Sequence, residues 1–387
     1  MTLTAHTDDT LAMLRDSLAR YLDDRHDFAQ HLQALAGCGT APPPFWRGLA
    51  RDLDLLGAAL PEAQGGLGGG IAAHLAIMET LGAALAAEPY LSAIVIGAGL
   101  LQRHPGVVAD ALLARTVAGD ALPVLAHAEP QSRHERTHVQ ARLVQDAEGF
   151  QLDGHKAVVR AAPWATHFLV STRSHGGPCD AEGVSLVCVP ADAPGLRLRA
   201  YPLRDGVQAA ELQFDAVCLL PDALLGVAGD AMPAIEAVLD EATLAVCAEA
   251  VGVLRRLQGD TLEYVRQRRQ FGMAIAGFQA LQHRLADMHL ALAQAEALTA
   301  SVGDQLAAGA MSADERARAV SSAKVAASQA CRVVGQGAVQ LHGGMGITEE
   351  LAVGHCFRRA TLIEGLFGPA SWHLRRVARL SAGAGDP

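Results

Sequence analysis

The pattern of hydrophobic positions changes twice along the chain of 387 residues. Residues 1–121 repeat apolar positions at helical spacing. In residues 122–228, short runs rich in valine and leucine alternate with turn residues, which predicts a mostly antiparallel β domain. Helical spacing returns in residues 229–387. The order predicts an α+β protein with an amino-terminal helical domain, a middle β domain and a carboxyl-terminal helical domain at these boundaries.

Local patterns predict individual elements. Leucines three and four residues apart indicate a helix over Asp8–Tyr21. The proline and glycine cluster of Leu60–Gly70 predicts a loop, because glycine loses much backbone entropy inside a helix. Asp153-Gly154 predicts a hairpin turn, since both residues tolerate positive φ. Ser312 and Glu315 have the spacing of a capping box at a helix start.

One apolar stripe stands out in the carboxyl-terminal region and predicts a helix that packs against a core. Its members alternate three and four residues apart and are Phe278, Leu281, Leu285, Met288 and Leu292.

Charge and composition narrow the function. The net charge of −10 argues against a nucleic-acid partner, which would favour a basic face. No apolar run is long enough to span a bilayer, and the first residues lack a secretion signal. The seven cysteines are an odd, scattered set without a CxxC pair, which argues against a metal site or a disulfide framework. These features predict a cytoplasmic protein with reduced thiols.

Two sequence blocks carry the strongest functional signal. RRQFGMAIAGFQALQHRLADM runs from Arg268 to Met288, and QLHGGMGITEE runs from Gln340 to Glu350. They resemble the carboxyl-terminal signature of the acyl-CoA dehydrogenase family. LPEAQGGLGG, AEPQSR and FQLDGHKAVVRAA resemble further family segments, so the likeness covers nearly the whole chain. The resemblance implies that family's fold, with a carboxyl-terminal four-helix bundle.

The resemblance also implies a bound FAD and assigns residues to it. Arg268 corresponds to the arginine that meets the flavin pyrophosphate of a neighbouring subunit, and a guanidinium fork suits phosphate oxygens. Phe271 and Gln279 correspond to further contacts with the same flavin. The glycine-rich block, with the candidates Gln340, Gly343 and Gly344, would let backbone approach the pyrophosphate closely. The family's Trp-Ile-Thr beside the flavin ring is replaced by residues 157–159.

The implied reaction is removal of a proton from the α-carbon of an acyl-CoA thioester and transfer of hydride from its β-carbon to the flavin. The proton requires a carboxylate base in a dry pocket. The two positions at which the family carries this glutamate hold Phe367 and Ala242 here.

Three nearby carboxylates remain as alternatives. Glu241 is one residue, or about 100° of helix rotation, from Ala242. Glu249 lies two turns along the face of Ala242, in an apolar run where an unpaired glutamate is costly. Glu364 precedes Phe367 by three residues. Each can instead be an ion-paired or surface side chain.

Details of HGGMGITEE and FRRATLIEGLFGPASWHL resemble the small subunit of pimeloyl-CoA dehydrogenase and related heteromeric bacterial enzymes. The implied function is FAD-dependent dehydrogenation of an acyl-CoA to a 2,3-enoyl-CoA, with electrons passed to an electron-transferring flavoprotein. The alternative is a non-catalytic subunit that completes the flavin site of a homologous chain. A third reading is a relative with oxidase, hydroxylase or DNA-associated activity. A homodimer, a homotetramer or a heteromer with a homologous subunit is expected.

Overall fold

The computed structural model describes residues 2–36 and 41–382. It shows helices, then β-strands, then helices, as the hydrophobic pattern predicts. No helix among the described residues has the length and apolar character needed to cross a bilayer.

The chain folds into two compact units. We call the first the helical unit; it combines Met1–Leu32, Ala58–Ala87 and Thr243–Pro387. We call the second the β unit; it combines Gln33–Gly57 and Glu88–Ala242.

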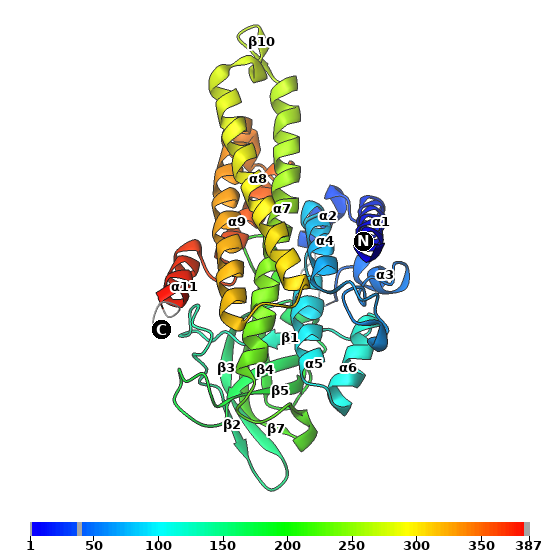
Figure 1. The fold of residues 1–387 in the computed structure, drawn as a ribbon, viewed down its shortest axis with the longest axis vertical. Coiled ribbons are helices and arrows are strands. Elements are labelled where there is room, and N and C mark those ends of the chain that lie inside the picture. Colours follow the sequence, from blue (N-terminus) through cyan, green and yellow to red (C-terminus); the bar gives the residue numbers. More distant parts are fainter. Residues whose placement is uncertain (1, 37–40, 383–387) are drawn as a thin grey trace. The chain divides into compact units, whose positions relative to one another are not determined.

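Long helices make up most of the helical unit, and α8 and α9 run side by side (Figure 1). The helices that contribute to it are α1 (Thr2–Arg25), α2 (Phe28–Ala36), α4 (Gly70–Ala83), α7 (Met232–Gln267), α8 (Gln279–Ala307), α9 (Ala313–His342), α10 (Ala352–Gly365) and α11 (Ala370–Ala382), with short 3₁₀ turns at Glu62–Gln64, Ile275–Gly277 and Gly343–Ile347. Helix α9 begins with the predicted capping box: the Ser312 hydroxyl accepts from the Glu315 amide, and the Glu315 carboxylate accepts from the Ser312 amide.

Two glycines set the close contact between α4 and α7. A β-carbon at Gly82 would lie 2.4 Å from the carbonyl oxygen of Glu249. A β-carbon at Gly252 would lie 1.9 Å from the carbonyl oxygen of Glu79. Each helix therefore offers the other a bare backbone, and no larger side chain fits at either position.

The β unit holds an eight-stranded sheet in the order β6-β7-β3-β2-β4-β5-β8, with β1 paired to β4. Most neighbours are antiparallel, as predicted; β1 and β2 pair with β4 in parallel. The strands are β1 (Pro123–Ala126), β2 (Arg142–Gln145), β3 (Phe150–Arg160), β4 (His167–Arg173), β5 (Val184–Pro190), β6 (Leu196–Pro202), β7 (Gln208–Leu219) and β8 (Leu224–Leu225). Helices α3 (Phe45–Arg51), α5 (Gly99–Arg103) and α6 (Val107–Val117), the π-helical segment Leu91–Ala98, and 3₁₀ turns at Ala162–Trp164 and Pro221–Ala223 belong to the same unit.

Two local predictions need correction. Asp153-Gly154 is not a hairpin turn, because both residues lie inside β3, where Gly154 allows a register shift against β7. The turn comes earlier, at Gly149, whose positive φ and close approach to the Leu219 carbonyl require glycine. The apolar stripe of α8 is only partly core: Met288 and Leu292 are buried, whereas the stripe nearer Phe278 is half-exposed.

Candidate functional site

A short hairpin joins α7 to α8 at one end of the helical unit (Figure 1). Its strands are β9 (Arg269–Gln270) and β10 (Met273–Ala274). Between them, Phe271 and Gly272 both have positive φ, as a two-residue type I′ turn requires. The Phe271 side chain is 91% exposed in that conformation, which costs free energy for a bulky residue and is typical of functional positions.

The predicted flavin residues Arg268 and Gln279 flank this hairpin and are exposed. The Arg268 carbonyl accepts a hydrogen bond from the Ile275 amide at 2.9 Å, which fixes the base of the hairpin. Its guanidinium makes no ion pair within the described ranges 2–36 and 41–382. The backbone is therefore held while the charged group can pair with another molecule.

The glycine-rich block lies beside the same end of the bundle. The ring of Tyr264, four residues before Arg268, stacks on His342 with centroids 4.3 Å apart. His342 ends α9, and the chain then turns at Gly343, with φ of +62°. An added β-carbon at Gly343 or Gly344 would meet no described atom within 4 Å, so this backbone borders open space.

The structure thus brings the two sequence blocks together. We call the hairpin, its flanking residues and the glycine-rich turn the bundle end. Its six predicted cofactor residues are all exposed: Arg268, Phe271, Gln279, Gln340, Gly343 and Gly344. A guanidinium, two amides and accessible glycine backbone are a donor set that fits a pyrophosphate. No part of the described chain buries these residues, so a second molecule is needed to enclose a ligand here.

The loop after α10 contains Phe367, the first of the two positions expected to carry the base. Buried hydrogen bonds hold the helix end before this loop, although Phe367 itself supplies no carboxylate. Helix α10 ends at Gly365, and Phe367 follows with φ of +58°. Lys324, whose side chain is fully buried, donates to the carbonyls of Ile363 and Glu364 at 2.7 and 3.1 Å. A cation at these last carbonyls stabilises the helix end. The second position, Ala242, is completely buried in α7.

All three alternative carboxylates are ion-paired. Arg103 Nη2 lies 2.5 Å from Oε1 of Glu241. Arg359 holds Glu249 with two hydrogen bonds, one of them 2.8 Å long, and both side chains are buried. The paired carboxylates are Glu241 with Arg103, Glu249 with Arg359 and Glu364 with Arg332. Each pairing matches the structural alternative recognised in the sequence, and none of the three is left as a free base.

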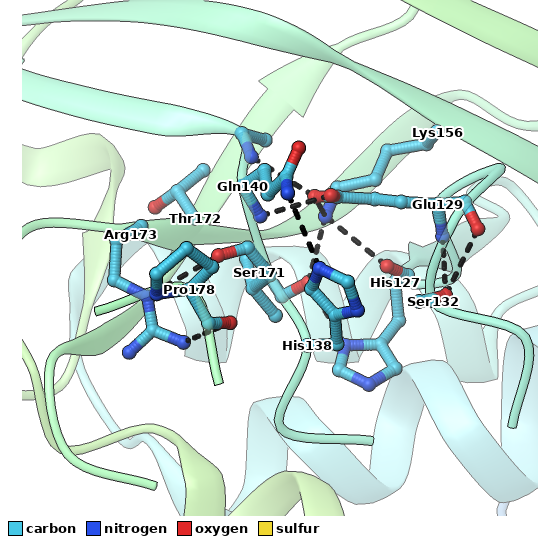
Figure 2. Close-up of polar contacts among 12 residues, drawn as sticks. His127, Glu129, Ser132, His138, Gln140, Lys156, Ser171, Thr172, Arg173 and Pro178 are labelled. Atoms are coloured by element: carbon cyan, nitrogen blue, oxygen red, sulfur yellow. Dashed lines mark hydrogen bonds and ion pairs between the residues drawn. The ribbon is translucent and has the colours of Figure 1, made fainter. Parts of the chain in front are cut away.

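A buried polar network in the β unit was not anticipated from the sequence (Figure 2). Lys156 Nζ, which is fully buried, donates to Glu129 Oε1 at 2.8 Å, to Ser171 Oγ at 3.1 Å and to the His127 carbonyl at 3.1 Å. The Glu129 carboxylate also accepts from the amides of residues 140 and 141, each at 2.9 Å. The alternating pattern of β3 was a usable signal, because it places Lys156 on the same face as the buried Leu152.

Burial and the neighbouring charges shift the pKa values of the ionisable groups in this network. Burial lowers the pKa of Lys156 to about 8, although Glu129 opposes the shift. Burial alone would raise the pKa of Glu129, but Lys156 and the backbone amides lower it. Burial, together with Lys156 and Arg136, lowers the pKa of His127 to about 3, so that imidazole is neutral. The network therefore fixes the segment from His127 to Ala141 with one internal ion pair.

Three family models match the chain along its length. They are described as acyl-CoA dehydrogenase N-terminal domain (residues 8–104), middle domain (residues 124–217) and C-terminal domain (residues 230–381).

Similar proteins cover most of the chain. The probable acyl-CoA dehydrogenase YngJ of Bacillus subtilis is 26% identical over 88% of this chain and 90% of its own length. Isovaleryl-CoA dehydrogenase of Arabidopsis thaliana is 25% identical over 96% of this chain and 90% of its own length. Among solved structures, a variant of the Tcur3481–Tcur3483 steroid ACAD is 30% identical, with a TM-score of 0.86 over 98% of this chain and 100% of that one. The ChsE4–ChsE5 complex from Mycobacterium tuberculosis is 25% identical, with a TM-score of 0.85 over 97% of this chain and 98% of that one.

Proposed function

The chain belongs to the acyl-CoA dehydrogenase family of oxidoreductases, and on this premise we propose that it takes part in FAD-dependent dehydrogenation of an acyl-CoA to a 2,3-enoyl-CoA. Electrons then pass to an electron-transferring flavoprotein. The observation that carries the proposal is the bundle end, where the six residues matched to the family's flavin contacts are all exposed and the stacked rings of Tyr264 and His342 join the two sequence blocks.

The bundle end supports binding of FAD across a subunit boundary. Arg268 has a fixed backbone and a guanidinium without an ion-pair partner among the described residues, so it can pair with a pyrophosphate. Gly343 and Gly344 offer amides without side chains in the way. FAD, when bound, supplies the hydride acceptor. The protein residues bind and orient it, and the exposed Phe271 excludes water once a second chain covers it.

The ion-paired carboxylates favour a second candidate function. A general base needs a free carboxylate near the substrate. Phe367 and Ala242 cannot act as bases, and Glu241 and Glu249 are engaged by Arg103 and Arg359. This supports a subunit that completes the flavin site of a homologous chain, with the base supplied by that chain. Two of the similar solved structures carry paired names, Tcur3481–Tcur3483 and ChsE4–ChsE5.

An anaerobic titration with a panel of acyl-CoAs separates the two candidates. The purified chain is examined alone and after co-expression with a homologous subunit. Bleaching of the oxidised-flavin band by the chain alone supports a self-sufficient dehydrogenase. Bleaching only in the co-expressed complex supports the partner-dependent role. A protein that binds no flavin in either form contradicts the proposal.

A further inference from the structure

Two buried histidines join helix α2 to helix α10 inside the helical unit. His31 Nε2 lies 3.2 Å from His355 Nδ1, and the two residues are 8% and 3% exposed. The ring of Phe28, three residues before His31, stacks on His31 and meets His355 edge-on, with centroid distances of 6.0 and 5.1 Å. Two imidazoles that are 324 positions apart in the sequence are therefore held in one mutual orientation.

The surroundings of His355 decide which nitrogen donates. Its Nε2 lies 3.2 Å from the carbonyl oxygen of Glu349 and 3.2 Å from the carboxylate Oε2 of the same residue. Neither oxygen carries a hydrogen, because Arg358 pairs with that carboxylate and lowers its pKa, so Nε2 is the donor. Burial lowers the pKa of both histidines, that of His31 to about 3, and both rings are neutral at neutral pH. In the neutral ring of His355, Nδ1 is then the acceptor, so His31 donates to it.

Helix α10 packs at this point against the backbone of the glycine-rich turn. A β-carbon at Gly354 would lie 3.1 Å from the carbonyl oxygen of Thr348, directly after the 3₁₀ turn Gly343–Ile347. Gly354 thus lets α10 approach, and the neighbouring His355 bonds the Glu349 carbonyl. The first two glycines of the turn border open space. The turn is therefore held on the side of α10 and open on the side assigned to the cofactor.

We propose that His31 and His355 are positioning residues for the glycine-rich turn, so that docking of α2 sets the backbone that meets the cofactor. This inference rests on the proposed function, in which the turn approaches the FAD pyrophosphate. Loss of the His31 donor leaves His355 Nδ1 buried without that partner, which costs free energy. The ring then gains by turning towards water, which releases the Glu349 carbonyl and loosens the turn. A mobile turn binds the cofactor more weakly, because more conformational entropy is lost on binding.

The test measures two quantities on the full-length protein: hydrogen exchange of residues 343–351 without FAD, and the affinity of the deflavinated protein for FAD. His31→Phe keeps a ring beside Phe28 and removes the donor. His31→Gln places an amide nitrogen near the position of Nε2 and restores the bond. His31→Asn has the same amide on a shorter chain that does not reach His355, and it serves if the phenylalanine variant does not fold. Gln30→Ala is the matched control, because it removes the side chain that caps the Asp27 amide at the start of α2 and leaves the histidine pair in place.

We expect the turn of His31→Phe to exchange faster than wild type and FAD to bind roughly fivefold or more weakly, whereas His31→Gln and Gln30→Ala keep both quantities near wild type. Wild-type exchange and FAD affinity in His31→Phe, with only a lower unfolding midpoint, would overturn the inference. Equal losses in His31→Phe and Gln30→Ala would overturn it too, since they would result from helix stability alone. Failure of the wild-type protein to bind FAD contradicts the proposed function, and hydrogen exchange of the turn then decides the inference alone.

Discussion

The buried network of the β unit and the bundle end of the helical unit both contain charged side chains. In the network these side chains are paired within the chain, whereas at the bundle end they are exposed. In the network, Lys156 makes three hydrogen bonds and Glu129 accepts from both Lys156 and the backbone. At the bundle end, Arg268 has no ion-pair partner among the described residues, and Phe271 is almost fully exposed at positive φ. One region satisfies its polar groups inside the chain, and the other does not.

This difference distinguishes polar groups that stabilise the fold from polar groups that are available to bind another molecule. Buried charges are tolerated only when they are paired, so a complete internal pairing accounts for the network without any ligand. Exposed groups that are held in strained or fixed geometry leave most of their surface uncovered by the chain, which points to a second molecule. The same reasoning applies to Glu249, whose buried carboxylate is paired with Arg359 inside the chain.

Removing the cation of the network has the largest expected effect on stability. Lys156→Met leaves the Glu129 carboxylate buried without its cation, and we expect a loss of about 3–5 kcal/mol in the free energy of unfolding. Thermal and urea unfolding measure it. The matched control is Arg197→Met, whose partner Asp215 is mostly exposed, and it should cost no more than about 1 kcal/mol. Equal effects of the two substitutions would refute the contrast between the regions.

Acid should weaken the same network. The folded pKa of His127 is about 3, below its ordinary value of 6.5, so the unfolded chain binds more protons between these limits. Stability should therefore fall as pH drops from 6.5 towards 3, and His127 should have no effect above 6.5. The groups facing the imidazole are Lys156, Arg136, Glu129 and Ser171. His127→Asn should flatten the profile of unfolding free energy against pH, whereas the exposed His283→Asn should leave it unchanged.

Much of the fold was predictable because its causes are local. Helical spacing in α1, the capping box of α9 and the strand-rich middle segment each depend on residues near one another in sequence. The residues assigned to the bundle end could be named from the sequence, because they lie within two short motif blocks; their contact with a flavin stays a prediction. What the sequence did not indicate was their shared exposure, since exposure depends on which helices pack where.

Features that depend on distant residues were missed or left open. The partners of Lys156 come from two other segments of the β unit, the stretch after β1 and strand β4, which no periodicity reveals. Asp153-Gly154 was wrongly predicted as a turn because local turn preference was outweighed by pairing of β3 with β7. The pairing of Glu249 with Arg359 joins residues 110 positions apart.

At the bundle end, the substitution Arg268→Ala should act on the ligand and leave the fold intact. Loss of a charged hydrogen-bonding group at a pyrophosphate should weaken FAD binding by about 1.5–3 kcal/mol, with unfolding unchanged. Flavin content and titration of the apoprotein measure it. Arg266→Ala, also exposed and two residues away, is the control and should retain wild-type flavin content. Full retention of FAD by the Arg268 variant would contradict the assignment of the bundle end as an FAD-binding surface.

Phe271→Asn should have the smallest effect on the chain itself and still change its assembly. Asparagine tolerates positive φ, so the substitution relieves backbone strain worth about 1–2 kcal/mol. It also removes an edge-to-face contact with Phe278, at a centroid distance of 6.0 Å, worth about 0.5–1.5 kcal/mol. These terms oppose each other, so unfolding should stay within about 1 kcal/mol of wild type. Sedimentation should instead show weaker association, because the exposed ring no longer fills a site on a second chain. Wild-type association would mean that the strained phenylalanine is not a contact between subunits.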